Sequence, residues 1–362
     1  MGLDKLRDRR LRPAVNSRRT ISAWQRFRAA SEGGQPVPAP PSLSRTIGDV
    51  GVRLLLLGCS GFVGRELVPF LLELGHTITL VSRRPQPFPA QAGDRLLCLK
   101  LDPADPASWQ QDSLRQALAA AQGVVNLAGE PIAERRWTPE HLERLVSSRV
   151  RTTELLVQAI ARLPHPPAVL VNGSAVGYYG TSADDRFGEA AAPGDDVLGQ
   201  LCRQWEAAAQ AVPSPTRLVI LRIGIVLGPD GGALGKMLPV FRAGFGGPVG
   251  SGRQWMSWIH RHDLCRLIAA ALEDTTYNGV FNAVAPEPVR MADFAAALGR
   301  SLGRPSLLPV PGAILRLLLG DGAQVVLEGQ QVLPERLAAQ GFRYQYPDLS
   351  AALGAATSPG LR

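Results

Sequence analysis

The chain has 362 residues, of which 45% are hydrophobic and 19% charged, with four cysteines and a formal net charge of +8. This length allows two or three domains with a sizeable core, and the composition excludes collagen-like, wholly disordered and disulfide-rich miniprotein classes. No apolar run approaches the ~18 residues of a membrane span, so we expect no transmembrane helix. The cysteines lack a C-x-x-C pair or a nearby His cluster, which predicts no disulfide and no metal site and fits a reducing intracellular compartment.

The positive charge is concentrated at the start of the chain. Residues 1–50 contain ten basic and four acidic side chains, whereas the other 312 residues contain 29 basic and 27 acidic ones. A basic stripe on the folded body is therefore not supported, and we expect no nucleic-acid partner. Residues 1–50 lack a sustained apolar period, which predicts a disordered basic leader. It is a transit peptide, a nonspecific electrostatic arm or an extension with no role; Asp4 and Asp8 count against a transit peptide.

From Val52 onward, short apolar runs alternate with segments of helical spacing. The predicted strands are Val52–Leu57, Thr77–Val81, Leu96–Leu101, Gly123–Ala128, Ala168–Val171 and Arg217–Leu221. The predicted helices between them are Phe62–Leu74, Ser108–Ala121, Pro139–Leu163 and Leu198–Ala211. This alternation predicts an α/β fold with a Rossmann-type, doubly wound parallel sheet, whose ligands bind at the carboxyl ends of the strands.

After Gly228 the alternation is lost. A glycine-rich stretch is followed by helices at Leu264–Leu272 and Phe294–Leu302, with one strand at Val280–Ala283. We therefore expect three folded parts after the leader. They are a dinucleotide-binding Rossmann domain (51–228), a smaller α/β substrate lobe partly interleaved with it (229–306) and a small C-terminal domain (307–355).

A glycine-rich turn follows the first predicted strand and opens the first helix, with the sequence Gly58-Cys59-Ser60-Gly61-Phe62-Val63-Gly64. Glycines at such a turn let the backbone approach a pyrophosphate, which the positive end of the helix dipole stabilises. A tight turn without a ligand is the alternative, but strand, turn and helix come in the order that a dinucleotide site needs. The predicted cofactor contacts are Gly58, Ser60, Gly61, Phe62, Val63 and Gly64.

Two arginines follow the end of the second predicted strand, about twenty residues after the glycine turn. An acidic residue there would accept hydrogen bonds from ribose hydroxyls of NAD, whereas guanidinium groups pair with the 2′-phosphate of NADP. Arg83 and Arg84 thus favour NADP over NAD, with a solvated surface turn as the alternative. Asp102, after the third strand, is a candidate for contact with the adenine edge by position alone.

Further motifs carry a resemblance to a known family. Asn126-Leu127-Ala128-Gly129, S-A-V-G-Y-Y-G (174–180) and Arg222 follow the fourth, fifth and sixth predicted strands. With the glycine turn, they resemble the extended branch of the short-chain dehydrogenase/reductase superfamily. Residues 126–137, 231–239 and 250–260 are similar to an atypical epimerase-like subfamily of the NAD-dependent epimerase/dehydratase type. That subfamily ends in a short domain of unassigned function, which residues 309–353 resemble.

The resemblance covers residues 51–355 and implies cofactor contacts at Leu127, Ala128, Gly129 and Arg222. Members are often labelled nucleoside-diphosphate-sugar epimerases or, in plastid-bearing organisms, plastid-division factors. Neither label fixes a reaction. We expect a cytoplasmic protein, or a plastid stromal one if the leader is a transit peptide.

The same resemblance exposes a departure from the family pattern. Extended members carry a Tyr-x-x-x-Lys pair at the start of the helix before the sixth strand, usually followed four residues later by Glu. Aligning that Glu with Glu206 places Leu198 at the tyrosine and Cys202 at the lysine, so both groups are absent. Without the lysine a tyrosine keeps a pKa of about 10, so about one molecule in a thousand is phenolate at pH 7. Tyr178 and Tyr179 are therefore predicted to donate hydrogen bonds but to be poor general bases.

Other residues are candidates for the reaction. The resemblance implies that the hydroxyl of Ser174 holds a substrate carbonyl, with a capping role as the structural alternative. Glu130, at the strand end facing the nicotinamide, either supplies a carboxylate or is solvated. His260 is a candidate substrate contact, but His260 and Asp263 match a motif that usually ties the second lobe to the first. A structural role for His260 is therefore favoured over direct catalysis.

The stretch 244–255 (G-F-G-G-P-V-G-S-G-R-Q-W) is the other glycine-rich segment. It lacks the Lys-Ser/Thr ending of a phosphate-binding P-loop, so it does not indicate an NTPase. Arg253, Gln254 and Trp255 can close over a polar or phosphorylated substrate. A flexible connection is the alternative.

Two functions follow from these residues. The first is an NADP-dependent oxidoreductase or epimerase, in which Ser174 and a Tyr178 or Tyr179 hydroxyl polarise the oxygen of a polar substrate such as a sugar nucleotide. The second is a nucleotide-sensing or scaffold protein that kept the cofactor fold without rapid chemistry and is linked to cell or plastid division. Nucleic-acid binding through the leader is a weaker third. A small-molecule substrate is the expected partner, and a homo-oligomer or a protein partner is left open.

Overall fold

The computed structural model describes residues 51–84, 88 and 90–358, so the predicted leader lies outside the described residues. The described residues belong to one compact unit, Val50–Arg362. None of their helices combines the length and the apolar character needed to cross a membrane.

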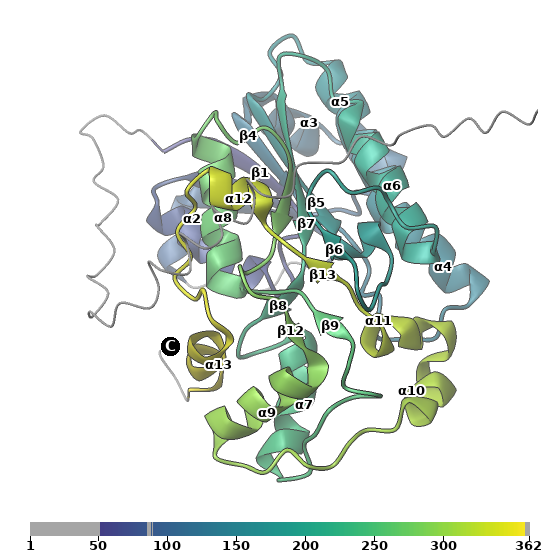
Figure 1. Cartoon of the computed structure of the whole chain (residues 1–362). Helices are drawn as coiled ribbons and strands as arrows, with labels where there is room; N and C mark the ends of the chain where they lie inside the picture. Colours follow the sequence, from purple (N-terminus) through teal and green to yellow (C-terminus); the bar gives the residue numbers. More distant parts are fainter. Residues whose placement is uncertain (1–50, 85–87, 89, 359–362) are drawn as a thin grey trace, which may run out of the picture. The chain divides into compact units, whose positions relative to one another are not determined.

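A seven-stranded parallel sheet runs through the described residues in the order β3-β2-β1-β4-β5-β7-β11 (Figure 1). Its strands are β1 (Arg53–Leu57), β2 (Thr77–Ser82), β3 (Leu96–Lys100), β4 (Gly123–Asn126), β5 (Val169–Ala175), β7 (Arg217–Ile223) and β11 (Gly279–Ala283). The order reverses between β1 and β4, which is the point where doubly wound sheets bind ligands. The predicted Rossmann-type fold is confirmed.

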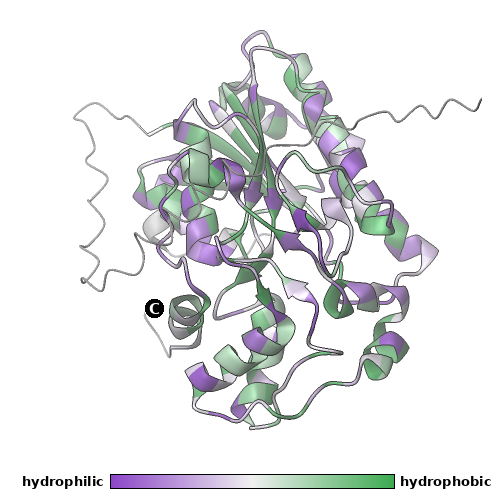
Figure 2. Cartoon of the chain, viewed as in Figure 1, coloured by the Kyte–Doolittle hydropathy of each residue, from purple (hydrophilic) through white to green (hydrophobic). Residues whose placement is uncertain are grey.

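Helices cover both faces of this sheet because its strands are apolar on both faces. The covering elements are α2 (Gly64–Glu73), α3 (Asp112–Ala120), α4 (Pro139–Val146), the π-turn η3 (Ser147–Arg151), α5 (Thr152–Ala161), α6 (Val197–Gln210) and α8 (Arg261–Glu273). Leu54 and Leu56 of β1 pack in one cluster with α2 and α8. Leu55 and Leu57 point to the opposite face, where they pack with α3 and α5. Figure 2 shows the resulting band of hydrophobic strands between the helices.

Three predicted element bounds are corrected by packing. The predicted helix Ser108–Ala121 is broken at Gln111, which has an extended backbone between the 3₁₀ turn η2 (Pro106–Gln110) and α3. β5 and β7 run past their predicted ends because they pair with each other as far as Ala175 and Ile223. Ser174 and Arg222 therefore lie inside strands rather than after them.

The segment after β7 builds a smaller lobe and then returns to the sheet. The lobe contains β8 (Ile225–Leu227), α7 (Gly232–Arg242), β9 (Trp255–Met256), β10 (Trp258–His260), β12 (Val289–Arg290) and α9 (Met291–Leu302). The predicted strand Val280–Ala283 is β11, which extends the large sheet beside β7 rather than belonging to the lobe. Helix α8 packs on α2. The two parts are thus interleaved through α8 and β11.

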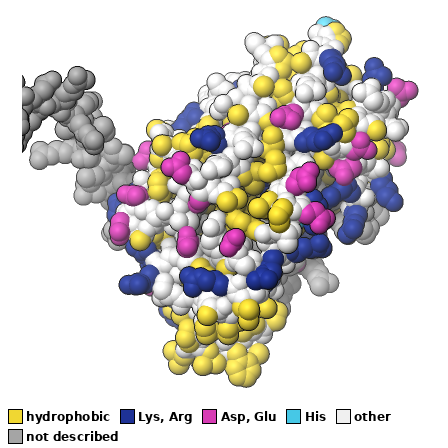
Figure 3. Space-filling view, turned by 90° about the vertical axis from the view of Figure 1, so that its right-hand side faces the viewer, with side chains coloured by type: hydrophobic (Ala, Val, Ile, Leu, Met, Phe, Trp, Pro, Cys, Tyr) yellow, Lys and Arg dark blue, Asp and Glu magenta, His cyan; other side chains and the backbone are white. Residues whose placement is uncertain are grey.

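The C-terminal segment runs back over both parts of the fold. It contains α10 (Gly312–Leu319), η5 (Gly320–Ala323), α11 (Gln324–Leu327), β13 (Gln331–Val332), α12 (Glu335–Ala339) and α13 (Leu349–Thr357). β13 pairs with β6 (Arg186–Phe187), α12 contacts β11, and α13 packs on α9. Helix α10 instead buries none of its residues, and Leu317 is 74% exposed. Figure 3, which shows the right-hand side of Figure 1, has hydrophobic side chains gathered at its lower end.

Candidate functional site

The glycine turn after β1 is shaped by close approaches of the backbone. Gly58 has a φ of +71°, and a Cβ there would lie 2.4 Å from the Cα of Ala128. A Cβ on Gly64 would lie 1.7 Å from the carbonyl oxygen of Cys59, so this glycine lets α2 pack on the turn. A Cβ on Gly61 would meet nothing within 4 Å. The side chain of Val63 does not cap α2, and the N–H groups of Arg65 and Glu66 bond the carbonyl oxygens of Gly61 and Val63. The positive end of the α2 dipole still favours an anion at the turn.

A cavity of about 370 Å³ lies at the reversal point between β1 and β4, and we call it the nucleotide cavity. It brings together seven of the predicted cofactor residues. They are Gly58, Ser60, Gly61, Arg83, Asp102, Ala128 and Gly129. The hydroxyls of Ser60 and Ser82 lie 2.6 Å apart and join the turn to the end of β2. The sequence pattern thus located this cavity through its glycines and the residues after β2, β3 and β4.

The remaining predicted cofactor residues do not line the nucleotide cavity. Phe62 turns its ring toward Gly231 and Gly232 at the start of α7, and the guanidinium of Arg261 lies 4.7 Å from the ring centre. Arg84 is exposed, and Leu127 packs against the core beside Gly173. Val63 precedes α2 and Gly64 begins it, so these two contribute through backbone and packing.

Glu130 lies elsewhere than predicted. Its carboxylate accepts a hydrogen bond from Nη2 of Arg83 at 2.9 Å, and both residues line the nucleotide cavity. This hydrogen bond lowers the pKa of Glu130 below its ordinary value. Glu130 was predicted to supply a carboxylate at the strand end facing the nicotinamide; in the structure its carboxylate is instead paired with Arg83, which follows β2.

A buried polar network holds the chain after β4. The Nδ2 of Asn126 donates to Thr153 at 2.9 Å and to Asn172 at 2.8 Å, and its Oδ1 accepts from the N–H of Ala128 at 3.2 Å. The indole of Trp205 also donates to the Thr153 hydroxyl. The network fixes Ala128 and Gly129 at the edge of the nucleotide cavity, because each polar group in it is satisfied by another.

A second cavity of about 320 Å³, which we call the inner cavity, lies at the ends of β5 and β7. Its walls include Ile132, Arg149, Ser174, Val176, Leu198, Leu201, Cys202, Trp205, Ile223, Ile225, Trp255 and Gln324. The hydroxyl of Ser174 donates to Oε1 of Glu206 at 2.7 Å. Leu198 and Cys202 line the same cavity as Ser174, and burial raises the pKa of the Cys202 thiol to about 12. Most of the wall is therefore apolar, and its thiol stays protonated.

The two tyrosines after β5 do not line the inner cavity, which corrects their prediction as catalytic groups. The buried hydroxyl of Tyr179 donates to Oδ1 of Asn282 at 2.6 Å and accepts from Nη1 of Arg222 at 2.9 Å. Burial raises its pKa to about 12. The guanidinium of Arg222 lies 3.4 Å from the ring centre of Tyr178.

Arg222 is bound by protein groups on every side. It forms a buried ion pair with Glu206 and donates to the carbonyl oxygen of Glu189 at 3.1 Å. It lines neither the nucleotide cavity nor the inner cavity. Its predicted contact with a cofactor is corrected accordingly: the ion pair with Glu206 holds β7 and α6 together instead.

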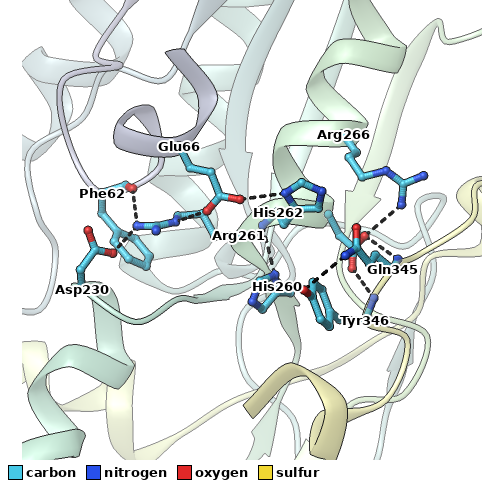
Figure 4. Close-up of polar contacts among 10 residues, drawn as sticks. Phe62, Glu66, Asp230, His260, Arg261, His262, Arg266, Gln345 and Tyr346 are labelled. Atoms are coloured by element: carbon cyan, nitrogen blue, oxygen red, sulfur yellow. Dashed lines mark hydrogen bonds and ion pairs between the residues drawn. The ribbon is translucent and has the colours of Figure 1, made fainter. Parts of the chain in front are cut away.

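The His260 segment joins the lobes (Figure 4). Glu66 of α2 accepts from Nε of Arg261 at 2.6 Å and contacts Nδ1 of His262 at 2.9 Å. Arg261 also donates to the carbonyl oxygen of Phe62, in the glycine turn, and to Asp230. Although burial raises the pKa of Glu66, the hydrogen bonds from His262 and Arg261 lower it overall.

The predicted substrate contact of His260 is corrected. This side chain is buried, and its Nδ1 accepts from the N–H of His262 at the start of α8. Its ring centre lies 4.0 Å from that of Tyr346. Asp263 accepts the N–H groups of Gln345 and Tyr346 at 2.7 and 2.9 Å, which fastens the C-terminal segment to α8. His260 and Asp263 thus hold the fold together.

The predicted substrate contacts of the glycine-rich stretch 244–255 line two different cavities. Arg253 and Gln254 line an outer cavity of about 800 Å³, whereas Trp255 lines the inner cavity. The Nε2 of Gln254 donates to the carbonyl oxygens of Val249 and Val326, so it ties this stretch to α11. The guanidinium of Arg290 lies 3.7 Å from the ring centre of Trp255.

Sequence reasoning missed several cavity residues. Arg149 lines the inner cavity, and the buried hydroxyl of Thr152 lines the nucleotide cavity without a hydrogen-bond partner among the described residues. His141, Leu145 and Arg149 recur every four residues on the buried side of the helix, which is the one signal that marks Arg149. Gln324 comes from the C-terminal segment, whose fold the sequence did not predict. In the described part of the chain, no group of three His, Cys, Asp or Glu side chains is placed to hold a metal ion.

The strand order, the glycine turn and the crevice between β1 and β4 define a Rossmann-type protein with a dinucleotide-type crevice. The profile of the NAD dependent epimerase/dehydratase family matches residues 54–283, and the chain belongs to this family. Residues 310–356 match a domain of unknown function, DUF1731.

Named relatives cover most of the chain. It is similar to the chloroplastic homolog of epimerase family protein SDR39U1 from Arabidopsis thaliana, with 43% identity over 82% of this chain and 84% of that protein. Human epimerase family protein SDR39U1 is 40% identical over 83% of this chain and 98% of its own length. The crystal structure of the human protein (isoform2) with NADPH has a TM-score of 0.75 and 39% identity, covering 84% of this chain and 98% of that one. UDP-glucuronic acid 4-epimerase from Bacillus cereus, with UDP-glucuronic acid and NAD, shares the fold at 19% identity and a TM-score of 0.67, covering 84% and 97% of the two chains.

Proposed function

We propose that this protein is an NADP-dependent oxidoreductase of the epimerase family, whose substrate binds in the inner cavity. The observation that carries the proposal is the meeting of the glycine turn and Arg83 in one cavity. The NADPH in the crystal structure of human SDR39U1 supports the same cofactor here.

The residues of the nucleotide cavity fit NADP(H). The open space at Gly61 and the uncapped start of α2 suit a pyrophosphate. The side chain of Arg83 is 58% exposed and suits a 2′-phosphate, which would compete with Glu130 for the guanidinium. When bound, NADP(H) supplies or accepts a hydride at its nicotinamide ring. The inner cavity adjoins this site, since a Cβ on Gly129 would lie 2.9 Å from Cζ of Arg149.

Ser174 is the group that would orient the substrate. Its hydroxyl proton is directed to Glu206, so its oxygen can accept a hydrogen bond from a substrate hydroxyl in the inner cavity. Arg222 holds the carboxylate of Glu206 in place through two hydrogen bonds. This arrangement positions a carbinol without the Tyr-x-x-x-Lys pair.

A second candidate function is a nucleotide-sensing or scaffold protein with slow or no chemistry. The observation that favours it is the inner cavity itself, because Leu198 and Cys202 replace the usual proton-transfer groups and Tyr179 is bonded elsewhere. Plastid or cell division remains a proposed context for this alternative.

Titration of the purified protein with NADPH and NADH, by protein fluorescence and calorimetry, tests the cofactor. We expect NADPH to bind more tightly than NADH. Arg83→Ala should weaken NADPH binding by about 10- to 100-fold and change NADH binding little. No binding of either dinucleotide would remove the proposal. Equal binding of both, unaffected by Arg83→Ala, would remove the preference for NADP.

Turnover separates the two candidate functions. NADPH oxidation is followed with a panel of sugar nucleotides and small carbonyl compounds, and Ser174→Ala is compared with wild type. Turnover that falls at least tenfold in Ser174→Ala supports the oxidoreductase. Tight NADPH binding with no turnover on any compound supports the sensor or scaffold.

A further inference from the structure

Arg149 is a buried cation without a counter-ion. The residue is 8% exposed and lies in the π-turn η3, between α4 and α5. Its guanidinium donates to the carbonyl oxygens of Leu145 at 3.3 Å and Glu130 at 2.9 Å, and lies 3.5 Å from the hydroxyl of Ser148. All three acceptors are neutral. Among residues 51–84, 88 and 90–358, no carboxylate forms an ion pair with Arg149, since that of Glu130 binds Arg83.

Such a charge is unfavourable in the folded protein until an anion reaches it. Burial lowers the pKa of Arg149 to about 10, so the guanidinium is still protonated at neutral pH. Within the described residues its Nε–H has no hydrogen-bond partner, which leaves part of its Nε and Nη2 edge free. That edge is the one with which arginine binds a carboxylate, as Arg222 binds Glu206.

The guanidinium forms part of the wall of the inner cavity. It lies 5.5 Å from the ring centre of Trp205, and Cys202 and Leu198 line the same space. The cavity's two acidic residues bind groups other than Arg149: Asp196 caps α6, and the exposed Glu328 accepts the hydroxyl of Thr181, which lines the same cavity. A small apolar cavity with one uncompensated guanidinium fits an anion that has a hydrocarbon body.

We propose that Arg149 binds a carboxylate of the substrate, so that the inner cavity takes a small apolar hydroxy- or oxo-acid. This inference rests on the proposed function and narrows its substrate class. The carboxylate pairs with Arg149, and the hydrocarbon body packs on Trp205 and Leu198. Ser174 lines the same cavity and then orients the hydroxyl of the bound acid.

The test compares an acid with its neutral amide on the full-length protein. Hexanoate and hexanamide are titrated calorimetrically with and without NADP⁺, on wild type, Arg149→Gln, Arg149→Lys and Arg151→Gln. Arg151 is exposed and lies in the same π-turn, so Arg151→Gln is the matched control. NADPH binding is measured on each variant, which tests the proposed function separately.

We expect wild type to bind hexanoate at least about tenfold more tightly than hexanamide. Arg149→Gln should abolish this preference and leave hexanamide binding unchanged, whereas Arg149→Lys should retain part of it and Arg151→Gln all of it. Equal binding of acid and amide by wild type overturns the inference, even if Arg149→Gln fails to fold. Arg149→Gln that weakens NADPH and keeps the preference for the acid overturns it too, because the charge then serves the cofactor.

Discussion

The carboxylate of Glu206 accepts hydrogen bonds from Nε and Nη2 of Arg222, each at 2.8 Å, and both side chains are 4% exposed. The same carboxylate also accepts the hydroxyl of Ser174. One buried acid therefore joins α6 to β7 and sets the direction of a hydroxyl in the inner cavity.

Replacing this acid should destabilise the protein strongly. Glu206→Gln leaves the guanidinium of Arg222 buried without its counter-ion, so we expect the free energy of unfolding to fall by about 3–5 kcal/mol. Urea denaturation followed by tryptophan fluorescence measures the change. Glu154→Gln, at an exposed position on α5, should change it by less than about 0.5 kcal/mol. Equal effects of the two substitutions would contradict the importance of the ion pair.

Two glycines of the turn after β1 should respond differently to alanine. Gly61→Ala meets no neighbour within 4 Å, so we expect unchanged stability and NADPH binding weakened at least about tenfold by a methyl group where the pyrophosphate approaches. Gly64→Ala places its methyl 1.7 Å from the carbonyl oxygen of Cys59, so it should lose about 1–3 kcal/mol or more of stability. Thermal denaturation and NADPH titration separate the two effects. Normal NADPH binding by Gly61→Ala would show that the phosphates bind elsewhere.

Removing the hydroxyl of Tyr178 or of Tyr179 should have different effects on stability. Tyr179→Phe leaves the buried Oδ1 of Asn282 without its hydrogen-bond donor and removes one acceptor of Arg222, so we expect a loss of about 1–3 kcal/mol in the free energy of unfolding. Tyr178→Phe keeps the ring beside Arg222 and should change stability by less than about 0.5 kcal/mol. Chemical denaturation measures both. A loss of NADPH turnover in a folded Tyr178→Phe variant would show that the Tyr178 hydroxyl takes part in the reaction.

His260 should make the protein less stable in acid. Burial lowers its pKa to about 4 from an ordinary value of 6.5. As the pH falls below 6.5 the unfolded chain gains a proton on this residue, whereas the folded protein gains one only near pH 4. The free energy of unfolding should therefore fall by up to roughly 3 kcal/mol between pH 7 and pH 4 through this group.

His260→Asn isolates this effect, because the asparagine side chain can still accept the N–H of His262 at the start of α8. Urea denaturation at a series of pH values should show a shallower decline for His260→Asn than for wild type. Parallel declines would assign the acid sensitivity to other groups.

The sheet and the nucleotide cavity could be predicted because their signals are local. Apolar runs mark β1 and β2, and the glycines and Arg83 follow those strands directly. The pairing of Glu130 with Arg83 could not be predicted, since 47 residues separate the two. Arg149 was missed for a related reason. An arginine on a helix usually faces solvent, and only tertiary packing buries this one. Tyr179 was misplaced because its partner Asn282 lies on β11, a strand whose place in the sheet the sequence did not show.

The return of α8 and β11 to the large sheet has a consequence for protein engineering. Leu264, Leu267 and Ile268 of α8 are buried in the same cluster as Leu67 and Leu71 of α2. A polypeptide ending near residue 228 would keep the glycine turn but expose this apolar surface and leave β7 as a bare sheet edge. Residues 51–228 therefore do not form a unit that can be transferred alone. A chimera with a relative must exchange them together with α8 and β11, which complete the sheet.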